Sequence, residues 1–191
     1  MSILSAGHLF TDLNQGAVAA LLPFLVAERG LSLAAAGTLV LAATVSSSVV
    51  QPLFGIFSDN RPLPALMPLG VLSAGIGMAL VGVSPSYPLI LLCVVLSGIG
   101  VAAFHPEAAR FANYVSGRRR ARGMSFFSVG GNAGFALGPA LATPLVLAFG
   151  LPGTLFLGLP AAAMAAVLFL EASRMLSFKP EESENGREES V

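Results

Sequence analysis

Six long apolar segments alternate with short polar connections along the 191 residues of the chain. Each segment has about 20 residues or more, the length that a helix needs to cross about 30 Å of hydrocarbon. Polarity does not alternate from one residue to the next, so helices are predicted rather than the strands of a β-barrel. The predicted spans are 3–27, 32–57, 63–83, 87–112, 122–149 and 153–171. The pattern therefore predicts an all-α membrane protein with six transmembrane helices.

The composition agrees with this prediction. Hydrophobic residues make up 55% of the chain and charged residues 10%, and the mean hydropathy is +0.82. A soluble domain has about 25% charged residues. Nucleic acid is therefore not an expected partner, and the bilayer is.

The basic residues predict the orientation. Nine of the ten Lys and Arg residues lie in connections or ends on one side of the predicted spans, and Arg29 alone lies on the other. The positive-inside rule then places both termini in the cytoplasm. The expected location is the inner membrane of the cell, as a multi-pass protein. We expect a membrane bundle over 1–173 and an acidic, disordered cytoplasmic tail over 174–191.

Polar side chains within the spans indicate a pathway for protons or a solute. His8, Asp12 and Gln15 share one helical face of the first span, because they are spaced at i, i+4 and i+7. Such groups are costly in a membrane, so they are expected to face the bundle interior or a water-filled cavity. The predicted pathway residues are His8, Asp12, Gln15, His105, Glu107 and Asn132. The third and sixth spans have few polar residues and are expected to face lipid.

Each of these residues also has a structural interpretation. Asp12 could be hydrogen-bonded to a neighbouring helix, and Glu107 could pair with Arg110 three residues later. His105 precedes Pro106 and could belong to a helix kink. No metal site and no cofactor are predicted, because His105 and Glu107 point about 200° apart on one helix.

The fifth span contains a repeat of small residues. Gly130, Gly134 and Gly138 are spaced four residues apart and are followed by Pro139. This spacing lets a second backbone approach closely, so these four residues are predicted to form a helix-packing motif.

Two motifs resemble those of the major facilitator superfamily. Gly55, Asp59 and Arg61 resemble its first cytoplasmic loop, which would act as a conformational switch, although an ordinary polar turn is the alternative. The stretch 134–139 resembles its antiporter-type Gly-x-x-x-Gly-Pro motif. Further stretches at 7–16, 48–55, 103–108 and 127–132 resemble bacterial fosmidomycin-resistance-type transporters. In one departure, Pro62-Leu63-Pro64 follows Arg61, where the family usually has Gly and a second basic residue.

The resemblance implies a fold and a function. The fold would be the N-terminal six-helix half, a 3+3 inverted repeat, of a twelve-span transporter. The function would be alternating-access, proton-coupled transport of a small solute, with drug efflux as one form. Alternatively, the chain is a truncated or split half-transporter that is inactive without a complementary half. A homodimer or such a half is the expected partner, because polar faces would otherwise meet lipid.

An intramembrane enzyme is not expected. A six-helix serine protease needs Gly-x-Ser-Gly, and Val95 occupies the position of the first glycine before Ser97-Gly98. The substrate cannot be read from these motifs, because one fold carries many substrates.

Overall fold

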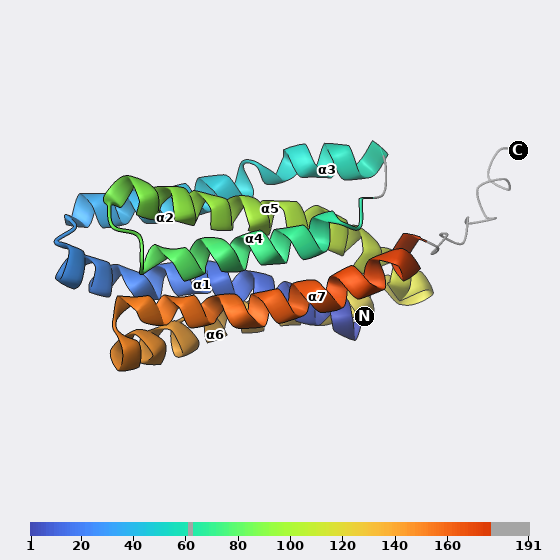
Figure 1. Cartoon of the computed structure of the whole chain (residues 1–191). Helices are drawn as coiled ribbons and strands as arrows, with labels where there is room; N and C mark the ends of the chain where they lie inside the picture. The colour runs from blue at the N-terminus through green and yellow to red at the C-terminus, as the bar shows by residue number, and fades with distance from the viewer. Residues whose placement is uncertain (61–62, 177–191) are drawn as a thin grey trace, which may run out of the picture.

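The computed structural model describes residues 1–60 and 63–176, and the described chain is helical with no strand. The helices are α1 (Ser2–Arg29), α2 (Leu33–Ser48), α3 (Gln51–Asn60), α4 (Leu66–Val81), α5 (Tyr87–Ser116), η1 (Gly117–Arg119), α6 (Arg120–Phe149), η2 (Leu151–Leu157) and α7 (Gly158–Leu176). The long helices lie side by side, and the N-terminus, the α5–α6 connection and the end of α7 are at the same end (Figure 1). The all-α prediction is confirmed. Residues 177–191 of the predicted tail and Arg61 of the predicted switch loop lie outside the described residues.

Four helical stretches of the described chain are long and apolar enough to cross a membrane. These are Ser2–Arg29, Leu33–Ser58, Tyr87–Phe149 and Leu151–Glu171. Tyr87–Phe149 has 63 residues and contains both α5 and α6, whereas α4 is an apolar helix of only 16 residues. The chain is thus built as a multi-pass membrane protein, and the count of six crossings stays a prediction.

The second predicted span is broken into two helices. α2 ends at Ser48 and α3 begins at Gln51. Pro52 has no N–H to donate to the preceding turn, and its ring would clash with the carbonyl oxygen four residues earlier, at Ser48, where α2 ends. In contrast, Pro106 lies inside α5, and Pro139 and Pro144 lie inside α6, without ending either helix.

α4 packs on protein along one face, whereas Leu69, Ile76 and Leu80 on its other face are exposed, so its contact with lipid stays a prediction. Ten of its sixteen residues are buried, since it packs between α5 and α7. A Cβ atom on Gly70 would lie 2.6 Å from the carbonyl oxygen of Gly100, and one on Gly75 would lie 2.2 Å from the Cβ of Ala161. Glycines therefore let both neighbours approach closely. A span without polar residues can thus pack on protein as well as on lipid.

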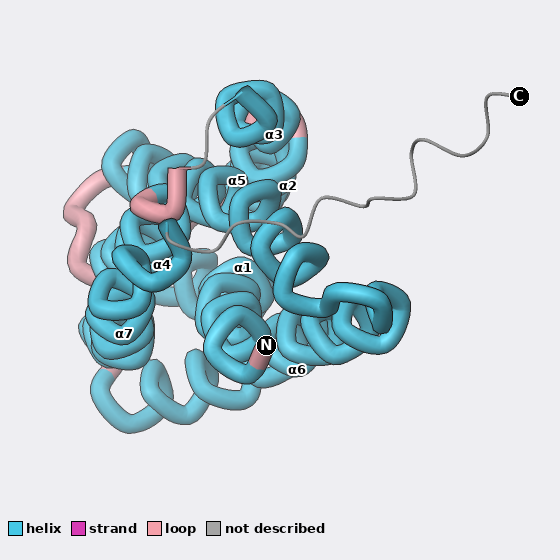
Figure 2. Tube along the Cα trace, turned by 90° about the vertical axis from the view of Figure 1, so that its right-hand side faces the viewer, coloured by secondary structure: helices cyan, strands magenta, loops and turns pink. Residues whose placement is uncertain are grey.

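α1 lies at the centre of the bundle when the helices are viewed end on (Figure 2). Two buried apolar clusters pack along it, one including Leu4, Phe104 and Phe127 and the other including Leu13 and Leu39. His8 and Asp12 lie between Leu4 and Leu13 on α1. The polar residues of α1 are therefore held between two rigid apolar layers.

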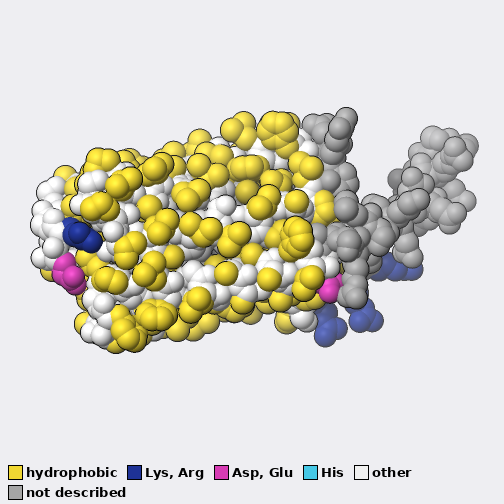
Figure 3. All heavy atoms as spheres, viewed as in Figure 1, with side chains coloured by type: hydrophobic (Ala, Val, Ile, Leu, Met, Phe, Trp, Pro, Cys, Tyr) yellow, Lys and Arg dark blue, Asp and Glu magenta, His cyan; other side chains and the backbone are white. Residues whose placement is uncertain are grey.

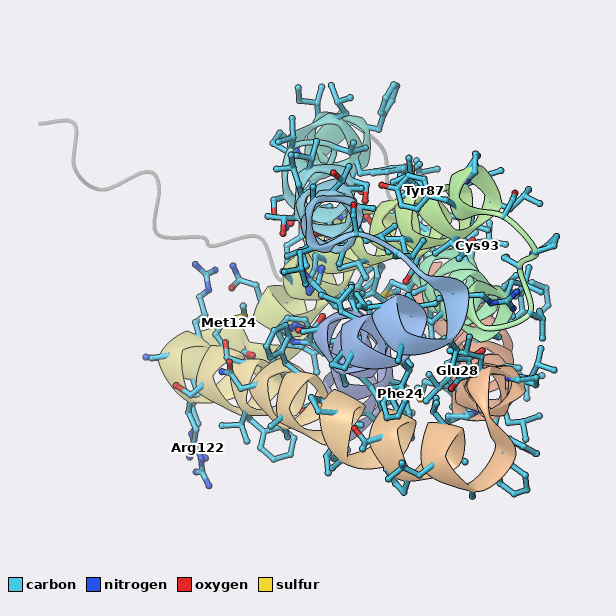
Figure 4. All side chains as sticks on the ribbon, turned by 90° about the vertical axis from the view of Figure 1, so that its left-hand side faces the viewer. Phe24, Glu28, Tyr87, Cys93, Arg122 and Met124 are labelled. Carbon is cyan, nitrogen blue, oxygen red and sulfur yellow. The ribbon has the colours of Figure 1, made fainter. Side chains whose placement is uncertain are left out.

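The surface is apolar along the bundle and charged at its ends. Hydrophobic side chains cover the side shown in Figure 3, and the Lys, Arg, Asp and Glu side chains visible there gather at the two ends. Arg122, near the start of α6, points away from the bundle (Figure 4). A soluble monomer rarely exposes so much contiguous apolar surface, so this surface suits lipid.

Candidate functional site

Two histidines and an aspartate from α1 and α5 meet inside the bundle. His8 Nε2 lies 3.2 Å from Asp12 Oδ2, and His105 Nε2 lies 3.1 Å from Asp12 Oδ1. The two Nε2 atoms are 3.0 Å apart. The side chains of His8, Asp12 and His105 are only 12%, 15% and 18% exposed. We call these three residues the His–Asp–His cluster.

Backbone carbonyls fix both imidazole rings. His8 Nδ1 lies 3.0 Å from the carbonyl oxygen of Phe127 in α6, and His105 Nδ1 lies 2.8 Å from that of Val101 in α5. A carbonyl oxygen can only accept, so each Nδ1 must carry the hydrogen and donate it. The Nε2 atom of each neutral ring is then an acceptor. Phe127 also stacks on His8, with ring centroids 4.2 Å apart.

The cluster therefore brings acceptors together. Two Nε2 lone pairs and a carboxylate face one another, and a hydrogen bond between the two Nε2 atoms requires an additional proton on one ring. Among the described residues, Asp12 Oδ1 is a buried oxygen that accepts no hydrogen bond, although His105 Nε2 is 3.1 Å away. This arrangement favours the binding of a cation, either one or more protons or a metal ion.

α6 holds α1 in place through its glycines. Cβ atoms on Gly130, Gly134 and Gly138 would lie 2.3, 2.0 and 2.5 Å from the carbonyl oxygens of Ser5, Leu9 and Leu13. The four-residue spacing of the glycines thus matches a four-residue spacing on α1. Pro139 follows within α6 and is exposed.

Gly131 leaves room for the cluster itself. A Cβ atom there would lie 2.3 Å from His8 Nε2 and 2.8 Å from Asp12 Oδ2. Sequence reasoning missed this residue, because the repeat at 130, 134 and 138 explains packing without it. The dipeptide Gly130-Gly131 was the available signal.

Two other predicted pathway residues lie apart from the cluster. Gln15 Nε2 donates a hydrogen bond to Ser47 Oγ on α2, at 3.2 Å. Asn132 is exposed on α6, although its neighbour Gly131 is buried. Gln15 thus ties α1 to α2, whereas Asn132 is directed away from the packed interior.

Glu107 occupies a different environment from His105, two residues away. It is completely buried, it pairs with Arg110, and its Oε1 accepts a hydrogen bond from the Leu63 N–H at 2.9 Å. The pairing is the alternative that sequence analysis left open. Glu107 ties α5 to the start of the segment that leads into α4, and it is not part of the His–Asp–His cluster.

The described part of the predicted switch loop lies in α3. Gly55 and Asp59 belong to this helix. A Cβ atom on Gly55 would approach only the ring of Pro106 in α5, at 3.9 Å. The loop therefore continues from a helix that packs on α5 just beyond His105.

Comparison with known proteins assigns the chain to a family. The sequence model of the Major Facilitator Superfamily matches residues 4–190. The chain belongs to the major facilitator superfamily. The family consists of membrane proteins that move small solutes, and this agrees with the apolar helices of the described chain. The family predicted from the motifs is therefore confirmed.

Curated members of the superfamily match the chain over part of their length. The fosmidomycin resistance protein of Escherichia coli is 34% identical over 177 residues, which cover 93% of this chain and 43% of that protein. The uncharacterized transporter YfnC of Bacillus subtilis is 33% identical over 168 residues, covering 88% and 41%. The multidrug resistance protein 1 of the same organism is 24% identical over 142 residues, covering 74% and 36%. The chain thus spans about two-fifths of the length of these superfamily members.

Proposed function

We propose that the chain forms the half of a major-facilitator transporter that couples movement of a small solute to movement of protons through the His–Asp–His cluster. The observation that carries the proposal is the convergence of His8, Asp12 and His105, an arrangement that favours the binding of an additional cation. Histidine changes its charge near neutral pH, and intramembrane ionisable groups commonly form proton relays. Asp12 is ten residues from the start of α1, about 15 Å along the helix and so near the bilayer midplane.

We further propose six crossings of the inner membrane, with both termini in the cytoplasm. The support is the one-sided distribution of basic residues and the apolar sides of the bundle. In a Cys93→Ser background, cysteines introduced at 118 and at 86 are expected to be labelled from the cytoplasm and from outside, respectively. Labelling of position 86 only from the cytoplasm would contradict this topology.

Drug efflux is the proposed form of transport, and its support is the similarity to the fosmidomycin resistance protein of Escherichia coli. Fosmidomycin is therefore the first probe to test. Cells that express the chain, alone or with a complementary half, are expected to accumulate less of the drug and to tolerate more of it. In proteoliposomes with a pH-sensitive dye inside, added fosmidomycin is expected to cause a proton flux.

The deciding experiment compares Asp12→Asn with Glu28→Gln. Asp12→Asn removes the carboxylate of the cluster and should reduce the coupled flux to background, whereas Glu28 is an exposed residue at the other end of α1 and its replacement should have little effect. Membrane insertion of both variants is measured in parallel. Full gradient-driven transport by Asp12→Asn would assign that residue a structural role.

The proposed partner is a second copy of the chain or a separately encoded half. In support, the polar side chain of Asn132 is exposed on α6, where it would meet lipid if no partner covered it. Related halves of this fold share their orientation, so two copies can meet about an axis along the membrane normal. Cysteines at Asn132 are expected to cross-link between copies, and cysteines at Phe169 on α7 are not. If the chain is active as a strict monomer in lipid, this assembly is wrong.

A further inference from the structure

We propose that the His–Asp–His cluster is also a binding site for a divalent transition metal ion of the Zn²⁺ type. His8 Nε2, His105 Nε2 and a carboxylate oxygen of Asp12 would be the three protein ligands. Their ligand atoms all lie within 4.8 Å of one another. Two imidazoles and one carboxylate are a common ligand set for zinc sites that keep a fourth position open.

The distances between the ligand atoms suit a tetrahedral ion. Zinc binds nitrogen and oxygen at about 2.0–2.1 Å, so two ligand atoms of a tetrahedral site are about 3.3 Å apart. The two Nε2 atoms are 3.0 Å apart, and each lies near a different oxygen of Asp12, His8 at 3.2 Å from Oδ2 and His105 at 3.1 Å from Oδ1. Small outward movements of the rings, together with a turn of the carboxylate that directs one oxygen between them, would therefore admit the ion.

The surroundings of the two rings resemble the outer shell of a metal site. A metal-binding histidine usually donates its other ring N–H to a carbonyl or carboxylate, which fixes its tautomer and orientation. Both histidines meet this condition, through the carbonyl oxygens of Phe127 and Val101. The carbonyls belong to two different helices, so the helical packing orients both Nε2 lone pairs before any ion binds.

The Asp12 carboxylate supplies a second, independent reason to expect a cation. Its buried Oδ1 accepts no hydrogen bond from the described residues. A buried acceptor without a hydrogen-bond donor is costly, and a bound cation would remove this cost. The absence of a side chain on Gly131 lets α6 pack against the cluster without pressing a Cβ atom onto His8 Nε2 and Asp12 Oδ2.

The composition of the chain makes the proposal testable. The 191 residues contain two histidines and one cysteine, and both histidines are in the cluster. A site with two imidazoles from a single chain must therefore use His8 and His105. A purification tag without histidine keeps this argument valid for the purified protein.

The experiment measures metal binding by the full chain in lipid nanodiscs, without any transported solute. Zn²⁺ titration calorimetry is expected to give one ion per chain, and Co²⁺ is expected to give the visible absorption of a four-coordinate ion. X-ray absorption of the Zn²⁺ complex should show two imidazole ligands. His105→Gln and Asp12→Asn should each lower the affinity at least about tenfold, because loss of an outer partner alone costs about 10–100-fold.

Two further variants complete the test. Gly131→Ala retains all three ligands but introduces a Cβ atom against two of them, so the affinity should fall by about tenfold. Glu28→Gln removes an exposed carboxylate of α1 and should bind as the wild type does. Absent binding, or binding that His105→Gln leaves unchanged, would overturn the proposal. Metal binding is measured without a transported solute or a proton gradient. Its result is therefore independent of the transport assay, and failure of the metal site can be told apart from failure of proton-coupled transport.

Discussion

Two ionisable residues of α5, His105 and Glu107, are two residues apart and lie in different surroundings. His105 joins residues of α1 in the His–Asp–His cluster, where the Nε2 atoms of two histidines and a carboxylate face one another. Glu107 is completely buried, pairs with Arg110 and accepts the Leu63 N–H. The second environment has a permanently charged counterion, whereas the first sets a carboxylate against two imidazoles that are charged only when protonated. We therefore expect the cluster to carry function and the Glu107 pair to carry stability.

The largest effect on stability is expected from Glu107→Ala. Removing one partner of a buried ion pair leaves the other charge without its counterion, which costs about 3–5 kcal/mol. The free energy of unfolding in mixed micelles should fall by this amount. The double variant Glu107→Leu/Arg110→Met removes both charges and should recover most of the loss. If Glu107→Ala unfolds as the wild type does, the pair is not structural.

A smaller loss of stability is expected from Gly134→Ala in α6. The added Cβ atom would lie 2.0 Å from the carbonyl oxygen of Leu9, so α1 and α6 must separate. Such overpacking costs about 1–3 kcal/mol. Gly37→Ala is the matched control, because no atom lies within 4 Å of its added Cβ. Equal unfolding free energies of the two variants would argue against close packing of α1 on α6.

Asp12→Asn should change the unfolding free energy by less than about 1 kcal/mol, even though it is expected to abolish coupled transport. The amide keeps the shape of the carboxylate and removes a charge that is costly in the membrane. Functional sites commonly reduce stability in this way. A loss as large as that of Glu107→Ala would place Asp12 among the residues that stabilise the fold.

The smallest effect is expected from Asp59→Ala at the end of α3. We expect a shift in the accessibility of cavity-lining cysteines toward the cytoplasm, with unchanged expression and unfolding free energy. The measurement is the rate of cysteine labelling from each side of the membrane. An unchanged labelling pattern would favour an ordinary polar turn at this position.

The sequence predicts the helices well because a membrane-spanning helix needs a long run of apolar residues, which a hydropathy profile detects directly. The i, i+4 spacing of His8 and Asp12 likewise predicts that both side chains lie on the same face of α1. It does not predict that His105 meets them, since contact between α1 and α5 depends on how the helices pack in three dimensions. The closeness of the two histidines could not be predicted for the same reason, because His105 and His8 lie on different helices.

The close packing of one face of α4 on α5 and α7 could not be predicted from polarity, for a different physical reason. Inside a membrane, lipid tails and apolar side chains are equally hydrophobic, so polarity does not distinguish a lipid-facing helix from a packed one. Gly70 and Gly75 were the relevant signal, because small residues mark close helix contacts. The polar residues locate the candidate site, and the small residues locate the interfaces around it.

The match between the glycines of α6 and the carbonyls of α1 has a mechanical consequence. If α1 slid along α6 by one residue, the side chains beside the glycines of α6 would collide with the backbone of α1. The two helices should therefore move as one rigid body. His8 is anchored to Phe127 within that body, whereas His105 is anchored within α5. A rocking motion of α5 against the α1–α6 pair would then separate the two Nε2 atoms and release the cation that they share. The hinge of the transport cycle would pass through the cluster itself.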